Sequence, residues 1–202
     1  MKKRTIICIS REFGSGGHEI SQKLADMLDI PCYDKRLIER TAKEFGESES
    51  MINGADEQPV NYFPDDNYNP FSPFSQHEIL YFYDVNYKVF HMQVSVIKKA
   101  AEEGSCVIVG RVADEVLKKD PDMISIFVTA DMEDRVKRVM DYEQSERKET
   151  VQLVKRMDKL RANYYNFYSE NEWGECSSYD LSINVSKFGI EDAVAKLAKM
   201  LQ

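Results

Sequence analysis

The sequence predicts an α/β protein built on a parallel sheet of about five strands, with helices on both faces. Short apolar, β-branched runs alternate along the chain with longer segments whose apolar residues recur at helical spacing. The first run, at 5–10, is continuously apolar, which is typical of a strand buried on both faces. Such strands need helices above and below the sheet, and the alternation supplies them.

The individual elements follow from these patterns. Strands are predicted at 5–10, 30–33, 106–109, 124–128 and 181–185. Helices are predicted at 17–29, 35–46, 48–53, 77–103, 113–118, 131–142, 145–169 and 190–201. Asp34 and Ser48 precede two of these helices, and both residue types cap helix N-termini.

Length and composition limit the possible functions. The 202 residues, 43% hydrophobic and 31% charged, predict one globular domain over 1–202. A net charge of −8 argues against nucleic-acid and anionic-membrane binding, although a small anionic ligand needs only a few local arginines. The four cysteines have no C-x-x-C spacing and are expected to be free thiols. The sequence starts with no signal-peptide pattern and has no long apolar run, so we expect a cytoplasmic protein.

One stretch departs from the periodic pattern. Residues 54–76 contain four prolines and five interspersed aromatic residues with no helical or strand spacing. A loop of this length is usually functional or disordered, and the aromatic residues make pure disorder less likely because they need a surface to pack on.

Charged residues follow the predicted strands at the points where they end. Arg11 to His18 follow the first strand and Asp34 the second, while Arg111 and Asp114 follow the third. Ligands of parallel sheets bind at the carboxyl ends of the strands. We therefore expect glycines, carboxylates and arginines to meet at one edge of the sheet.

The loop after the first strand has three glycines in four positions, Gly14, Gly16 and Gly17, with Ser15 between them. A strand, a glycine loop and a helix present backbone N–H groups to a phosphate, although a simple tight turn has the same sequence pattern. The Gly-Lys-Ser/Thr ending of a Walker A loop is absent, and Gly17-His18-Glu19 stands in its place.

With these residues in order, the chain resembles the cytidylate kinase-like family of the P-loop nucleoside monophosphate kinases. The resemblance runs nearly end to end and is weakest at 46–90. It implies a three-layer P-loop kinase-like fold with a helical lid at 131–170 and a variable acceptor-side insertion, running into the long helix, at 46–90. In the cytidylate kinase loop G-P-S-G-S-G-K-G-T, Arg11 takes the position of the first glycine and Gly17 that of the lysine.

The resemblance also implies roles for individual residues. Gly14 to His18 would hold the donor phosphates, with Arg11 and His18 supplying charge in place of the lysine. Residues implied to bind the acceptor are Asp34, Arg40, Arg111, Asp158 and Arg161. Residues implied to act from the lid are Arg135, Arg138 and Arg156. Asp114 is the nearest carboxylate to the family's aspartate after the third strand, and hence a candidate metal ligand.

Structural roles remain open for several of these residues. Arg135 and Arg138 could pair with Asp131 or Asp134 on their own helix. Asp114 could serve as a helix N-terminal carboxylate, and Asp34 as a helix cap. Arg40, Arg111 and Arg161 could form surface ion pairs.

The implied activity is ATP- and Mg²⁺-dependent phosphoryl transfer to a nucleoside monophosphate such as CMP or dCMP. Several separated arginines suit this chemistry, because donor and acceptor together carry roughly five to six negative charges. Two alternatives remain: a kinase of the same fold with another small acceptor, or a nucleotide-binding sensor that has lost transfer with the lysine. The oligomeric state is left open.

Overall fold

A five-stranded sheet forms the centre of the computed structural model, which describes residues 4–58 and 76–201, with side chains in the second range from 84 onward. The strands are β1 (Ile6–Arg11), β2 (Cys32–Tyr33), β3 (Cys106–Val109), β4 (Met123–Thr129) and β5 (Leu181–Asn184), in the order β2-β3-β1-β4-β5. All neighbouring strands are parallel. The predicted fold class is confirmed, and the carboxyl ends of the strands share one edge.

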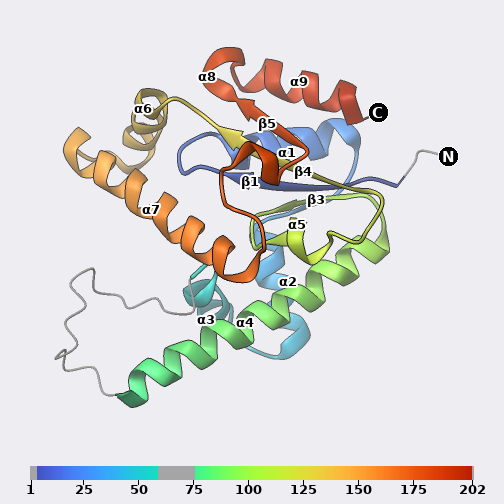
Figure 1. Ribbon diagram of the computed structural model, residues 1–202, viewed down its shortest axis with the longest axis vertical. Helices are drawn as coiled ribbons and strands as arrows, with labels where there is room; N and C mark the ends of the chain where they lie inside the picture. Colours follow the sequence, from blue (N-terminus) through green and yellow to red (C-terminus); the bar gives the residue numbers. More distant parts are fainter. Residues whose placement is uncertain (1–3, 59–75, 202) are drawn as a thin grey trace.

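Helices cover both faces of the sheet (Figure 1). Alternate residues of β1 point to opposite sides: Ile7 and Ile9 pack against α1 (Gly17–Leu28) and α9 (Ile190–Leu201). Ile6 and Cys8 pack on the other side against α2 (Lys35–Phe45) and α4 (Gln76–Glu103). This is why the first strand is apolar at consecutive positions, and it makes three layers.

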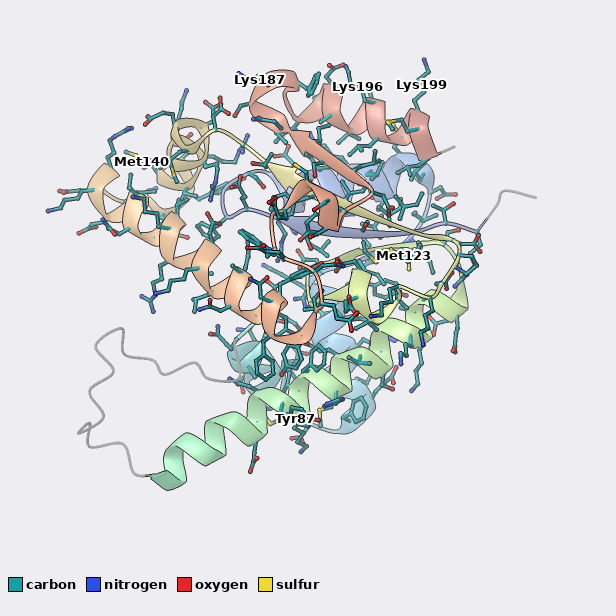
Figure 2. The ribbon with its side chains drawn as sticks, in the orientation of Figure 1. Tyr87, Met123, Met140, Lys187, Lys196 and Lys199 are labelled. Carbon is teal, nitrogen blue, oxygen red and sulfur yellow. The ribbon has the colours of Figure 1, made fainter. Side chains whose placement is uncertain are left out.

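Two helices flank the edge where the strands end (Figure 1). They are α6 (Met132–Glu143) and α7 (Arg147–Tyr168), which pack on each other through Val136, Val139 and Val154. Met140 lies at this contact in Figure 2. Figure 2 shows Lys187, Lys196 and Lys199 along the outer side of α8 (Val185–Phe188) and α9.

Most predicted elements lie within a few residues of the observed ones. Helix α3 (Glu49–Ala55) runs two residues beyond its predicted end, and α5 (Ala113–Val116) is two residues shorter than predicted. The short helix α8 and a 3-10 turn at Cys176–Ser178 were not predicted, because four or fewer residues carry no periodicity. The stretch 59–75, with its aromatic residues, lies outside the described residues.

The two predicted helix caps differ. Ser48 accepts a hydrogen bond from the Met51 N–H at 3.2 Å and caps α3 as expected. Asp34 occupies the N-cap position of α2, but its carboxylate makes no capping hydrogen bond. The Asp34 side chain is engaged elsewhere, as described below.

Cys8, Cys32 and Cys106 are buried free thiols, whereas Cys176 is exposed. None of the helices in the described part of the chain is both long enough and apolar enough to span a bilayer.

Ile20 of α1 is fully buried in the core between the sheet, α1 and α9, while Met27 of the same helix is 53% exposed. Replacing Ile20 with alanine should lower the free energy of unfolding by about 2–5 kcal/mol, because the lost side chain leaves a cavity. Urea denaturation followed by circular dichroism measures this. Met27→Ala is the matched control and should change stability by about 0.5 kcal/mol or less. Equal losses in both variants would contradict the observed packing of α1.

Candidate active site

The glycine loop between β1 and α1 has an ordered internal structure. Gly14 and Gly16 have φ values of 77° and 87°, in the left-handed region that glycine adopts without strain. The Ser15 hydroxyl donates to the Glu12 carbonyl at 2.8 Å and accepts from the Gly17 N–H at 3.3 Å. Gly16 occupies the N-cap position of α1 and provides no side-chain cap for the N–H groups that follow Gly17. Backbone donors at that terminus therefore remain available to an anion.

Helix α6 lies directly on this loop. Arg135 Nε donates to the Phe13 carbonyl at 2.8 Å, and Arg138 NH1 donates to the Gly14 carbonyl at 2.7 Å. A Cβ at Gly14 would stand only 2.8 Å from Val139 Cγ2. The two arginines thus hold loop carbonyls instead of pairing along their own helix. The Phe13 carbonyl points toward Arg135 of α6. In a trans peptide the N–H of the next residue points the opposite way, so the Gly14 N–H faces away from Arg135.

Asp158 also belongs to the loop, not to the acceptor side where the resemblance placed it. Its carboxylate accepts from the Phe13 N–H at 2.8 Å and pairs with Arg135. Arg135 also pairs with Glu12 at 3.0 Å, and Glu12 in turn accepts from the Ala130 N–H at 3.0 Å. Asp158 and Arg135 therefore fix the start of the loop against α6, α7 and the end of β4.

Two cavities flank the glycine loop. The first, of about 360 Å³, lies between α6 and the segment that joins β5 to α9; its lining residues are Asp134, Lys137, Arg138, Asp141, Val185, Ser186 and Gly189. The second, of about 260 Å³, lies between the strand ends, α2, α3 and α7; its lining residues are Arg11, Asp34, Lys35, Ile38, Asn53, Asp56, Glu57, Gln58, Arg111, Met157, Leu160 and Arg161. We call them the donor-side and acceptor-side cavities.

Arg111 forms the floor of the acceptor-side cavity and is only 3% exposed. Its guanidinium binds Asp56 with two hydrogen bonds of 2.8 and 2.7 Å, and NH1 reaches Asp34 at 3.1 Å. Gly110, Arg111 and Val112 have φ values of 69°, 56° and 56°. Consecutive left-handed residues other than glycine are strained, and such strain is concentrated at functional sites. The turn aims Arg111 back at the strand ends.

Arg11 is paired in the same way. It binds Glu57 through NH1 at 2.6 Å and NH2 at 3.0 Å, and the Arg111 backbone N–H donates to Glu57 Oε1 at 3.0 Å. Burial alone would raise the pKa of Glu57. The positive charges of Arg11 and Arg161 outweigh burial and hold this pKa well below its usual range.

Arg161 also lines the acceptor-side cavity, and His18 contacts it through Asp34. Arg161 NH1 donates to the Arg11 carbonyl at 3.2 Å, while its Nε stands 3.6 Å from Glu57. Burial and the nearby Arg11 charge lower the pKa of Arg161 to about 10. His18 Nδ1 lies 2.5 Å from Asp34. Burial would raise the pKa of Asp34, but Arg111 and Arg11 lower it below the ordinary value.

Three other predicted site residues line neither of these two cavities. Arg40 binds Glu103, at the end of α4 and near the amino end of β3, at 2.6 Å, so it faces the opposite edge of the sheet. Asp114 is buried and accepts a 2.6 Å hydrogen bond from the Tyr165 hydroxyl. No group of three or more metal-ligating side chains occurs among the described residues. Arg156 is exposed on α7.

The cavity also contains carboxylates that the sequence did not reveal. Asp56 and Glu57 follow the end of α3, within the stretch that lacks periodicity. Gln93 of α4 donates to Asp56 at 2.8 Å, and its own Oε1 is buried with no hydrogen-bond partner in the described structure. The hydrogen-bond partners of Asp56 and Glu57 lie 37 to 55 residues away in the chain. The local sequence therefore showed only that the two carboxylates stand next to a turn.

Arg111 and Arg40 provide a contrast in stability. Arg111→Ala should lower the free energy of unfolding by about 3–5 kcal/mol, because it leaves Asp56 and Asp34 without their buried partner. Arg40→Ala removes a pair with the half-exposed Glu103 and should change stability little. Urea denaturation of both variants measures the difference. A large loss in the Arg40 variant alone would contradict the arrangement.

Glu57 should make stability depend on pH. Because its native pKa lies below the ordinary 4.5, the ionised group stabilises the fold above pH 4.5. As pH falls from 4.5, the unfolded chain takes up a proton that the native protein does not, and this contribution is lost. We expect the stability advantage of the natural protein over Glu57→Gln to be constant above pH 5.5 and to shrink below pH 4.5. Denaturation curves from pH 7 to 3 test this; an advantage that grows on acidification would contradict it.

Comparisons with known proteins agree with the fold. A crystal structure of an uncharacterized protein from Eubacterium ventriosum ATCC 27560 is 32% identical, with 98% of each chain covered and a TM-score of 0.72. Shikimate kinase from Bacteroides thetaiotaomicron is 14% identical, with 98% of this chain and 99% of that chain covered and a TM-score of 0.56. Shikimate kinase from Acinetobacter baumannii, solved in complex with shikimate, is 13% identical, with 99% of this chain and 94% of that chain covered and a TM-score of 0.56.

A search of curated proteins gave no match. At this level of identity, the likeness to the shikimate kinases shows a shared fold alone. The model of the cytidylate kinase-like family matches residues 6–187, which is nearly the whole chain. The chain therefore belongs to the cytidylate kinase-like family.

Proposed function

We propose that the protein is a small-molecule kinase that transfers the terminal phosphoryl group of ATP to an acceptor in the acceptor-side cavity. One observation carries the proposal. The uncapped N-terminus of α1, with Gly14 and Gly16 in left-handed conformation, lies between two cavities at the carboxyl edge of the sheet. That arrangement suits a reaction in which two ligands meet at a phosphate-binding loop.

The donor side fits a nucleotide. Gly14 to His18 would hold the phosphates through backbone N–H groups, and the donor-side cavity next to Arg138 would take the nucleoside. Bound Mg²⁺ supplies positive charge that offsets the charge on the phosphates. Because the described residues contain no ready-made metal cluster, the ion would be held mainly through the nucleotide.

The first candidate acceptor is a nucleoside monophosphate of the CMP or dCMP class. Asp34, Arg111 and Arg161 would orient it. The new bond joins an acceptor phosphate oxygen to the terminal phosphorus, and the bond that breaks joins this phosphorus to the oxygen that leaves with ADP. A phosphate oxygen is already ionised at neutral pH and needs no base. This agrees with the lowered pKa values of Asp34 and Glu57, which make them weak bases.

A second acceptor class is favoured by the charge balance of the cavity. Arg11 and Arg111 are both engaged by carboxylates, Glu57 and Asp56. A dianionic acceptor must displace these carboxylates, whereas an acceptor that binds through hydroxyl groups can use them as hydrogen-bond acceptors. Here the acceptor hydroxyl would lose its proton to a cavity carboxylate as the new bond forms.

A coupled assay of ADP release tests the proposal with ATP, Mg²⁺ and a panel of acceptors. We expect acceptor-dependent turnover with CMP or dCMP, or with a hydroxyl-bearing acceptor if the second class is correct. Arg40→Ala is the control and should keep the turnover of the natural protein. If ATP raises the melting temperature but no acceptor supports turnover, the transfer proposal fails and a nucleotide-binding sensor remains. If ATP does not bind, the phosphate-loop interpretation fails as well.

A further inference from the structure

Two positions of the glycine loop have exchanged residue types. In the cytidylate kinase pattern G-P-S-G-S-G-K-G-T a glycine begins the loop and a lysine follows the third glycine. Here Arg11 begins the loop and Gly17 stands at the position of the lysine. The cation is thus not simply lost from this chain, because a longer cation is present six residues earlier.

The structure gives a physical reason for the exchange. A Cβ built on Gly17 would lie 2.5 Å from Arg11 Cβ and 2.9 Å from Arg11 Cγ. Real side chains never approach so closely, so only one of the two positions can carry a side chain in this backbone conformation. With arginine at 11, position 17 must be glycine.

The side chain of Arg11 runs from the glycine loop into the acceptor-side cavity. Its aliphatic part covers Gly17 at the start of α1, and NH1 lies 2.2 Å from where a Cβ of Gly110 would stand, at the end of β3. Arg11 also lines the acceptor-side cavity. A group transferred between the loop and that cavity must therefore pass beside this side chain.

Glu57 marks an anion position in front of Arg11. Its carboxylate accepts three N–H donors: NH1 and NH2 of Arg11 at 2.6 and 3.0 Å, and the backbone of Arg111 at 3.0 Å. Arg161 Nε is a buried donor 3.6 Å away with no hydrogen-bond partner in the described structure. A forked guanidinium with further N–H donors binds phosphate as well as carboxylate.

We infer that Arg11 replaces the Walker lysine as the ligand of the donor's terminal phosphate, and that Glu57 occupies this phosphate position until the nucleotide displaces it. The inference deepens the proposed function and rests on it. It assigns Arg11 a contact with the transferred group and gives Glu57 the task of neutralising the buried guanidinium between reaction cycles. Arg111 and Arg161 supply the neighbouring donors.

Isothermal titration with ATP and with ADP tests the inference without turnover. Arg11→Gly should weaken ATP binding at least ten-fold and ADP binding less than three-fold, because only ATP carries the terminal phosphate. The double variant Arg11→Gly, Gly17→Lys restores a lysine where space is now free, and should recover most of the ATP affinity. Glu57→Gln should bind ATP more tightly than the natural protein, since a neutral amide competes less for Arg11.

A further variant separates a loss of ATP affinity from a loss of folding. Arg11→Gly leaves Glu57 buried without its partner, so Arg11→Gln combined with Glu57→Gln removes both charges together and should also lose ATP affinity ten-fold. Circular dichroism confirms that each variant is folded, and Arg40→Ala is the unaffected control. Unchanged ATP affinity in the folded Arg11→Gln, Glu57→Gln variant would overturn the inference alone. Absence of ATP binding by the natural protein would overturn the proposed function and the inference with it.

Discussion

Two parallel guanidinium–carboxylate pairs hold the candidate site together. Arg11 at the end of β1 binds Glu57, and Arg111 after β3 binds the adjacent Asp56. Both arginines are nearly buried, so neither charge could remain there without its partner. The pairs tie the end of α3 to the carboxyl edge of the sheet. They also make the cavity almost neutral although it is lined with ionised groups.

The fold was largely predictable because its signals are local. Ile6 to Ile9 are apolar in succession since both faces of β1 are covered, and this pattern is readable without a structure. Helix boundaries followed from turn residues such as Gly46, which ends α2 in a left-handed conformation. The elements that escaped prediction, α8 and the turn at Cys176–Ser178, are too short to repeat any pattern.

The site was predictable only in part, since its pairings join residues far apart in the chain. Arg11, Asp34 and Arg111 do meet at the strand ends, as topology required, and Arg161 joins them from α7, as the resemblance implied. Arg40 does not, because its place on α2 turns it toward Glu103. Asp158 was assigned to the acceptor from a short sequence pattern, whereas in the structure its carboxylate binds the Phe13 N–H of the loop. Asp56 and Glu57 gave no signal because a carboxylate beside a turn is commonplace on protein surfaces.

The two cavities share no lining residue. The donor-side cavity is lined from 134 to 189, whereas the acceptor-side cavity takes its acidic residues from 34 and 56–57. Sequence change around α3 can therefore alter the acceptor-side cavity while the donor-side cavity stays intact. A scaffold divided in this way lets related chains diversify in substrate through a single interchangeable segment.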